Sequence, residues 1–331
     1  MVSGLFIYKS EFPRIVLKSP LPGHTVFVPR HKLSPKRVGI SILTAVLALP
    51  ALLMLASSSI FHVLFRRMPP PDLGQAPTYE DVDSKVYPRT EVRFPSGKHT
   101  LFGCWFPVAD SRGTVLIAHG LGSSGEAHLP ETLFFINHGF SVFTYDATGM
   151  GNSDGRSVVG ISQSRQDVIS AVRYLRKADP HGPLFLYGHS MGGYGVLSAL
   201  PEIDATAAVC INGFRKPIAL MHRCARRYVG ILADLAYPFL CLQNRLTFGK
   251  QGNTDALLAA KQAQIPVLIL NGKEDRLIPQ KAKLMAEETQ TGDILFRTVA
   301  GSHTGIWLSN DGRHVNESLM EMILRFFLSK Q

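Results

Sequence analysis

A serine enclosed by glycines is the residue of this sequence best suited to nucleophilic chemistry. Ser190 stands in Gly188-His189-Ser190-Met191-Gly192, after the apolar run 184–187 and before the small residues of 191–200. This order predicts a buried strand, a sharp turn and a helix packed close to a sheet, with glycines where a Cβ would not fit. Such a turn lifts the serine hydroxyl clear of the sheet. It also places the amide of Met191, at the helix N-terminus, where a developing oxyanion could accept its hydrogen bond.

A second Gly-x-Ser-x-Gly pentapeptide, Gly151-Asn152-Ser153-Asp154-Gly155, shows that the motif alone is weak evidence. It follows a polar loop rather than a strand, and it leads into Arg156-Ser157 rather than a helix. Because a nucleophile elbow requires both flanking elements, the context favours Ser190 over Ser153.

An activated serine needs a base, and the base needs an acid that orients it. In a sheet of parallel strands these groups follow later strands, in the chain order serine, acid, histidine. Asp275 lies in the turn after the predicted strand 266–270, and His303 lies in the turn after the predicted strand 294–299. Glu274 stands beside Asp275 and competes for the role of the acid.

The loop after the first parallel strand is expected to supply a second oxyanion donor. That loop is His119-Gly120-Leu121-Gly122-Ser123-Ser124-Gly125, and the amide of Leu121 is the candidate, together with that of Met191. A hydroxyl, an imidazole, a carboxylate and two amides suffice for acyl transfer. The predicted chemistry therefore requires neither a metal nor a cofactor.

Charge is spread very unevenly along the 331 residues. Residues 1–67 hold 9 of the 35 Lys and Arg residues but only one of the 25 Asp and Glu residues, Glu11. The rest of the chain is nearly neutral, so the high overall charge does not indicate nucleic-acid binding. The basic residues instead flank an apolar segment.

Residues 38–65 contain no Asp, Glu, Lys or Arg. As a helix, this segment would be about 42 Å long, enough to cross a hydrocarbon core of about 30 Å. We expect a single transmembrane helix; a cleaved signal peptide is the alternative, which the long basic leader does not fit. The excess of positive charge before the segment predicts a cytoplasmic N-terminus and a catalytic domain that is exoplasmic or lumenal.

The span divides the chain into segments of different composition. Residues 1–37 form a basic, irregular tail, which suits an anionic membrane surface. Residues 66–86 are rich in proline and acidic residues and are predicted to be a stiff linker. The catalytic domain is expected over 87–331, with an inserted cap at about 213–264, since this interval is longer than a crossover connection needs.

Strand and helix patterns alternate through the predicted domain. A hairpin at 91–106 precedes them. The predicted strands are 114–118, 141–145, 184–187, 207–211, 266–270 and 294–299; the predicted helices are near 126–137, 162–177, 191–200, 280–288 and 315–330. This alternation predicts an α/β fold with a mostly parallel, doubly wound sheet and ligands at the carboxyl ends of its strands.

Within the predicted cap, residues 216–232 are sharply amphipathic. At 100° per residue the basic side chains, Lys216, Arg223, Arg226 and Arg227, fall opposite the apolar ones, Ile218, Met221, Ala225, Tyr228 and Leu232. The apolar stripe could line an acyl pocket while the basic stripe faces anionic headgroups. Alternatively, the apolar stripe packs on the core and the basic stripe is solvated.

Together these motifs resemble the α/β-hydrolase family, in particular its serine aminopeptidase-like and monoacylglycerol lipase-like branch. The resemblance covers roughly residues 87–331, excluding the N-terminal 86. The motifs that carry it are His119-Gly120, Tyr145-Asp146 followed by Gly149, Gly151, Ser153 and Gly155, the Gly188–Gly193 elbow, the Gly272–Asp275 turn and Gly301-Ser302-His303. It implies an α/β-hydrolase fold with an inserted helical cap, a triad of Ser190, Asp275 and His303, and a structural role for 146–155. It also favours Asp275 over Glu274.

The family includes esterases, lipases, thioesterases and peptidases, so the resemblance defines the chemistry better than the substrate. We expect a membrane-anchored serine hydrolase of a carboxylic ester, with an acyl-lipid-like substrate and membrane lipids as partners. A thioesterase or peptidase of the same fold remains an alternative.

Two alternatives come from other classes of protein. Residues 120–125 match Gly-x-Gly-x-x-Gly, and Asp146 stands 21 residues after Gly125, as in a dinucleotide-binding site. That interpretation leaves Ser190, Asp275 and His303 unexplained. The other alternative is a hydrolase-like domain that binds a ligand without catalysis.

Overall fold

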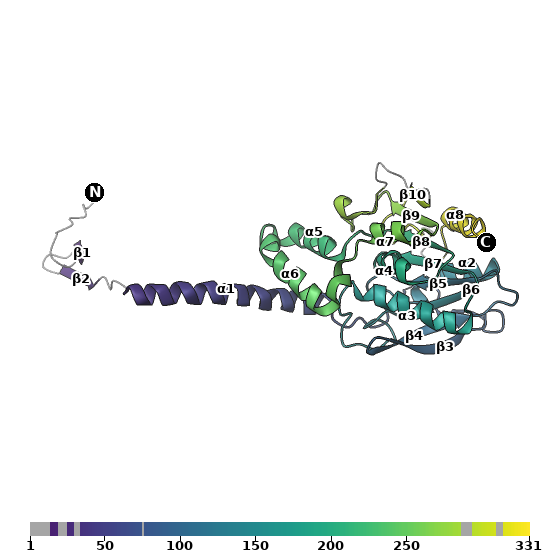
Figure 1. Ribbon diagram of the computed structural model, residues 1–331, viewed down its shortest axis with the longest axis horizontal. Helices are drawn as coiled ribbons and strands as arrows, with labels where there is room; N and C mark the ends of the chain where they lie inside the picture. Colours follow the sequence, from purple (N-terminus) through teal and green to yellow (C-terminus); the bar gives the residue numbers. More distant parts are fainter. Residues whose placement is uncertain (1–13, 19–24, 30–33, 75, 286–292, 309–313) are drawn as a thin grey trace. The chain divides into compact units, whose positions relative to one another are not determined.

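The computed structural model describes residues 14–18, 25–29, 34–74, 76–285, 293–308 and 314–331 (Figure 1). The chain divides into two compact units, 1–53 and 54–331. In the first unit, β1 (Arg14–Lys18) and β2 (Thr25–Pro29) pair antiparallel, within the tail that was expected to be irregular. The other residues predicted for that tail, except 34–37, lie outside the described part.

The helix α1 (Pro35–Leu64) covers nearly all of the segment 38–65 predicted to cross a membrane. Over the described residues, none of the helices combines the length and apolar character that a membrane crossing requires. The predicted span therefore stays a prediction from the sequence.

The segment 66–86, predicted as a stiff linker, packs against the rest of the second unit instead. Its Met68 amide donates a hydrogen bond to the oxygen of Gly149 at 2.9 Å. Tyr79 is buried, with its hydroxyl 3.0 Å from Oγ1 of Thr144. The linker interpretation is wrong because these contacts place the segment on the surface of the unit, although its composition suits an extended spacer.

An eight-stranded sheet forms the centre of the second unit, in the order β10-β9-β8-β7-β5-β6-β4-β3 (Figure 1). The strands are β3 (Thr90–Ser96), β4 (His99–Phe106), β5 (Thr114–Ala118), β6 (Ser141–Tyr145), β7 (Leu184–His189), β8 (Ala207–Ile211), β9 (Val267–Gly272) and β10 (Ile294–Val299). From β6 to β10 the neighbours are parallel, while β4 pairs antiparallel with both β3 and β6. The predicted hairpin and mostly parallel sheet are confirmed.

Each face of the sheet carries its own hydrophobic core, because neighbouring strand residues point to opposite faces. In β5, Leu116 belongs to one core, whereas Val115 and Ile117 belong to the other. The covering helices are α3 (Gln163–Ala178), α4 (Met191–Ala199) and α7 (Ala256–Ala263) on the first face, and α2 (Leu129–Asn137) and α8 (Glu317–Leu328) on the second. This double covering explains the apolar runs in the central strands.

Between β8 and β9 the chain forms α5 (Pro217–Val229) and α6 (Leu232–Phe248) before it returns through α7. Because α7 contacts α4, it belongs to the helical layer on the sheet, and the α5–α6 pair is the inserted part. In place of a helix near 280–288, the described residues contain only the short turn η5 (Gln280–Ala282), and 286–288 lie outside the described residues.

Candidate active site

Ser190 sits on a strained turn between β7 and α4. Its backbone has φ 52° and ψ −112°, a conformation that L-residues rarely adopt. A Cβ on Gly192 would lie 2.0 Å from the oxygen of Ala118, so no larger residue fits there. The strand, turn and helix predicted around this serine are all present.

His303 connects the serine to a carboxylate. Its Nε2 lies 2.9 Å from Oγ of Ser190, and its Nδ1 lies 2.9 Å from Oδ2 of Asp275. Because an ionised carboxylate can only accept, Nδ1 carries the proton and Nε2 is free to take one from the serine. Only 11% of the His303 side chain is exposed, and 1% of that of Asp275.

The second oxygen of the Asp275 carboxylate is held by the backbone. Oδ1 accepts hydrogen bonds from the amides of Leu277 at 2.8 Å and Ile278 at 3.1 Å. Burial is the largest influence on this carboxyl and raises its pKa, but the hydrogen bond and charge of His303, with both amides, bring the pKa below its ordinary value. The carboxyl is thus kept ionised opposite the imidazole.

Glu274, the competing acid, has a different partner. Its Oε2 accepts a hydrogen bond from the amide of Gly301, at the start of the turn that carries His303. This contact ties the two turns together, while only Asp275 reaches the imidazole.

Two free amides lie beside the serine. Met191 is the first residue of α4, and Leu121 follows Gly120, where an added Cβ would lie 3.3 Å from Cβ of Ser190. Within the described residues, neither amide donates a hydrogen bond to the protein. Both are available as donors to an oxygen that is held near Oγ of Ser190.

Comparison with known proteins shows the family to which this chain belongs. The family model described as serine aminopeptidase, S33, matches residues 109–249. Monoglyceride lipase from Mus musculus is 30% identical over 252 residues, covering 62% of this chain and 80% of the relative. The chain belongs to the α/β-hydrolase family. The branch suggested by the motifs, serine aminopeptidase-like and monoglyceride lipase-like, is thereby confirmed.

A second relative and a solved structure extend the comparison. The Saccharomyces cerevisiae membrane protein YNL320W is 26% identical over 264 residues, covering 77% of this chain and 88% of that protein. An esterase from Pyrococcus furiosus has a TM-score of 0.59 at 18% identity, covering 80% of this chain and 99% of the esterase. The predicted α/β-hydrolase fold is confirmed.

Two side chains to which the sequence analysis gave no role hold the loop that carries His303 in this α/β-hydrolase. Nε2 of His189 lies 3.1 Å from the backbone oxygen of His303, and Nδ2 of Asn212 donates to the same oxygen at 2.9 Å. Both residues are buried. The sequence could have indicated Asn212, because it directly follows β8 and functional residues of parallel sheets lie at the carboxyl ends of strands. His189 lies within the serine motif, and no feature of the sequence indicated a separate role for it.

The dinucleotide-like motif of this α/β-hydrolase has a structural role. Both carboxylate oxygens of Asp146 accept backbone hydrogen bonds, from Gly125 at 2.8 Å and from Asn152 at 2.7 Å. The carboxylate therefore joins two loops rather than being free for a ribose. Ser153, in the second pentapeptide, is buried and accepts from the amide of Phe102 at 2.8 Å.

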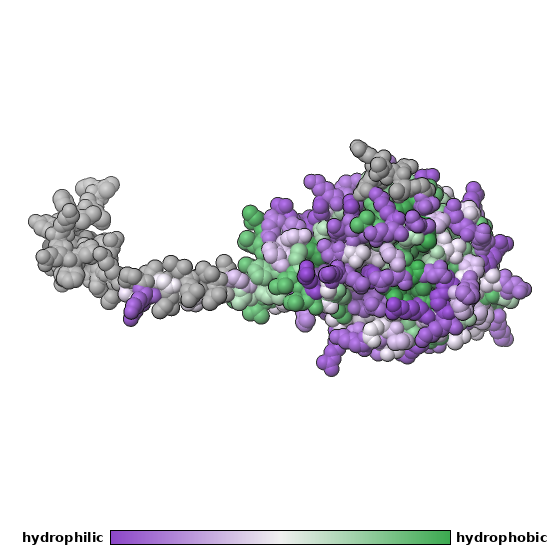
Figure 2. All heavy atoms as spheres, in the orientation of Figure 1, coloured by the Kyte–Doolittle hydropathy of each residue, from purple (hydrophilic) through white to green (hydrophobic). Residues whose placement is uncertain are grey.

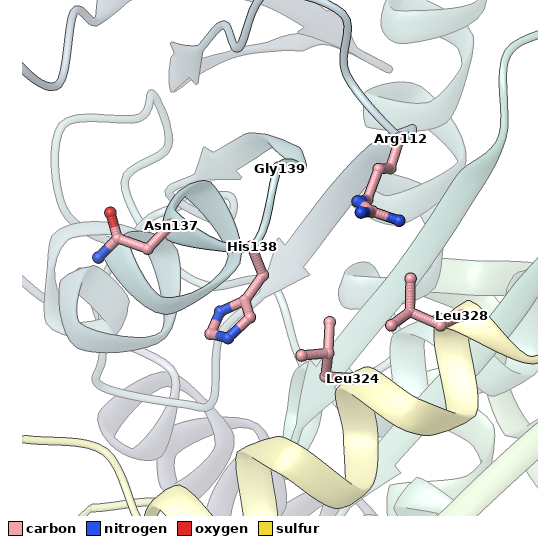
Figure 3. Close-up of a pocket in the computed structure, with 6 residues that line it drawn as sticks. All are labelled: Arg112, Asn137, His138, Gly139, Leu324 and Leu328. Carbon is pink, nitrogen blue, oxygen red and sulfur yellow. The ribbon is translucent and has the colours of Figure 1, made fainter.

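A cavity of about 420 Å³ lies away from the candidate triad. It is lined by Arg112, Asn137, His138, Gly139, Leu324 and Leu328, between the end of α2 and α8 (Figure 3). None of the triad residues or oxyanion donors contributes to its lining, so this cavity has no part in the arrangement around Ser190.

Proposed function

We propose that this α/β-hydrolase is a serine hydrolase that cleaves a carboxylic ester through Ser190, His303 and Asp275. The observation that carries the proposal is the position of the His303 imidazole, 2.9 Å from both the serine hydroxyl and the aspartate carboxylate. An imidazole held in this way has the tautomer that a general base requires.

The proposed reaction has two acyl-transfer steps. In the first, Oγ of Ser190 attacks the ester carbonyl while His303 takes the serine proton and then returns it to the departing alcohol. The amides of Leu121 and Met191 stabilise the tetrahedral oxyanion. In the second step, His303 takes a proton from water, which attacks the acyl-enzyme and releases the carboxylic acid and free serine.

The α5–α6 pair supports an acyl-lipid-like substrate. Tyr228, Ile231 and Leu246 are 87%, 73% and 72% exposed, and Figure 2 shows a hydrophobic area at this end of the unit. An exposed apolar area of this kind is typical of surfaces that contact a partner or a membrane. The mouse relative carries the name of a lipase, which agrees with a lipid ester.

The amphipathic stripe of α5 divides between the two roles considered for it. Ile218, near the start of α5, is 1% exposed and packs on the core, whereas Tyr228, near the end of α5, is exposed. Leu232, which the sequence placed on the same helix, is the exposed first residue of α6. On the basic side, Lys216 and Arg226 lie 3.5 Å from the carboxylates of Asp255 and Asp234. Two of the four basic side chains of the stripe thus have a carboxylate partner, and the exposed apolar residues at the end of α5 and the start of α6 carry the argument for a lipid substrate.

We further propose attachment to a membrane through residues 38–65, with the N-terminus cytoplasmic and the hydrolase domain exoplasmic or lumenal. The proposal rests on the absence of charged residues from this segment and on the basic residues before it. The name of the yeast relative, a membrane protein, agrees with it. Extraction of membranes with alkaline carbonate tests the attachment, because an integral protein stays in the pellet and release into the supernatant would contradict it.

A fluorophosphonate probe tests the nucleophile directly. In membranes that contain the full-length protein, we expect labelling of the wild type and none of Ser190→Ala. Ser153→Ala, which removes the serine of the other pentapeptide, is the matched control and keeps its label. A folded wild-type protein that does not react would overturn the proposal and favour a ligand-binding domain without catalysis.

Substrate class requires a separate comparison. Esters, thioesters and peptide anilides with the same acyl chain distinguish the proposed esterase from a thioesterase or peptidase of the same fold. For the lipid preference, the triple variant Ile231→Ser, Leu235→Ser, Leu246→Ser should lose activity on a long-chain ester in vesicles but keep activity on a soluble short-chain ester. An equal effect on both substrates would exclude a role of the apolar surface in lipid access.

A further inference from the structure

A groove outside the candidate active site has a strongly basic lining. Its volume is about 730 Å³, and it lies where Arg67 and the loop 152–159 meet the β3–β4 hairpin. We call it the basic groove, because Arg67, Arg93, Lys98 and Arg156 line it; His99 is also part of the lining. The loop 152–157 forms the remaining wall, and none of the triad residues contributes to it.

The charge of the basic groove is largely uncompensated. Its three arginines and one lysine share the lining with one carboxylate, that of Asp154. Over the described residues, none of the four forms an ion pair, whereas Arg165 and Arg176 on α3 are paired with Glu202 and Asp204. Collected like charges repel one another, and a bound anion relieves this repulsion.

The floor of the basic groove is held in place by the protein. Arg67 donates three hydrogen bonds to backbone oxygens of the loop, to Ser153 and Gly155 at 2.8 Å each and to Gly151 at 2.9 Å. These acceptors are neutral, so they orient the guanidinium and leave its charge in place. The loop backbone is thereby fixed before any ligand arrives.

Two side chains of the basic groove have polar groups whose hydrogen bonding the protein leaves incomplete. The guanidinium of Arg93 lies over the ring of Phe102, 5.8 Å from its centroid, and has only one long hydrogen bond, 3.4 Å to the oxygen of Asn152. Nε2 of His99 is buried and has no hydrogen-bond partner in the described structure. A polar atom in this situation is costly unless a ligand or water satisfies it.

We propose that the basic groove binds a phosphate group. Several guanidinium and ammonium donors around one space match the oxygens of a phosphate, which accepts multiple charge-assisted hydrogen bonds. Arg67 comes two residues after the uncharged segment 38–65, so a phospholipid headgroup and a soluble phosphate ester are the two sources of this group. The site is for binding, because the hydroxyl oxygens of both serines in its lining already accept hydrogen bonds: Ser153 from the amide of Phe102 at 2.8 Å and Ser157 from the amide of Val159 at 3.2 Å.

Titration calorimetry on the purified full-length protein in a neutral detergent tests the proposal. The probes are inorganic phosphate and n-octyl phosphate, which has no carboxylic ester for the active site to cleave. The double variant Arg93→Gln, Arg156→Gln removes two charges from the basic groove. The matched control Arg173→Gln, Arg297→Gln removes two exposed charges elsewhere.

We expect the Kd of the groove variant for both probes to be at least about tenfold higher than that of the wild type, because charge-assisted hydrogen bonds are lost. The control variant should have the Kd of the wild type. Tighter binding of n-octyl phosphate than of phosphate indicates a lipid headgroup, and equal binding indicates a soluble phosphate ester. Failure of the wild type to bind either probe, or equal binding by the groove and control variants, overturns the proposal. We expect the groove variant to hydrolyse a soluble ester at the wild-type rate. The proposal of phosphate binding can therefore be wrong while the proposal of ester hydrolysis is right, and the reverse.

Discussion

Nε2 of His189 lies 3.1 Å from the backbone oxygen of His303. The residue directly before the nucleophile thus holds the loop that carries the proposed base. Burial first, and then the neighbouring imidazoles of His303 and His128, lower the pKa of the His189 imidazole well below its ordinary value. The ring is therefore neutral, with its proton on Nε2 as the donor to His303. Strand β7 in this way positions the serine and the histidine together.

Replacing His189 should lower catalysis without removing any proposed catalytic group. His189→Phe keeps a ring of similar size but loses the donor to His303, so we expect kcat on a soluble ester to fall about 10- to 100-fold with KM little changed. Steady-state kinetics measure both constants. His181→Gln, at an exposed histidine, is the control, and a kcat within twofold of the wild type in His189→Phe would show that the contact does not position the base.

The two neighbouring acids can be separated by isosteric substitutions. Asp275→Asn removes the charge that faces Nδ1 of His303 and should lower kcat by a factor on the order of 10⁴. Glu274→Gln leaves that contact intact and changes only the bond to Gly301, so its kcat should fall less than about tenfold. The same kinetic assay serves both variants. The opposite ranking would assign the acid to Glu274.

The sequence was most informative where one element determines the geometry locally. The elbow around Ser190 and the strands on either side of it could be predicted, because glycine spacing and a buried strand leave few other conformations. The order of the turns with Asp275 and His303 followed from the rule that parallel strands collect their carboxyl ends at one edge.

Contacts between distant segments were beyond the reach of the sequence. The bond from Met68 to Gly149 and the burial of Tyr79 depend on a loop far along the chain, so 66–86 was mistaken for a linker. For the same reason, α7 was assigned to the cap although it packs on α4. Helical periodicity shows which face of a helix is apolar but not what covers it.

Gly192 should tolerate no side chain. In Gly192→Ala the new Cβ would lie 2.0 Å from the oxygen of Ala118 and 2.4 Å from its carbonyl carbon, so the backbone of β5 or α4 must shift. We expect a loss of about 3 kcal/mol or more in the free energy of unfolding, measured by denaturant titration. Gly39→Ala, where nothing lies within 4 Å of the added Cβ, is the control. Equal stability of the two variants would contradict the close approach of α4 to β5.

The buried imidazole of His189 should also make stability sensitive to mild acid. Its pKa in the folded protein lies well below the ordinary 6.5, so below pH 6.5 the unfolded chain binds a proton that the folded chain does not. The contribution of His189 to the free energy of unfolding therefore has its full value above this pH. It decreases as the pH falls toward the pKa of His189 in the folded protein, by up to about 1.4 kcal/mol per pH unit. Urea titrations between pH 7 and 5 measure how the free energy of unfolding changes with pH. This change should be smaller for His189→Phe than for the wild type. His181→Gln, whose histidine is exposed, should retain the full slope, and an unchanged slope in His189→Phe would mean that His189 is protonated in the fold.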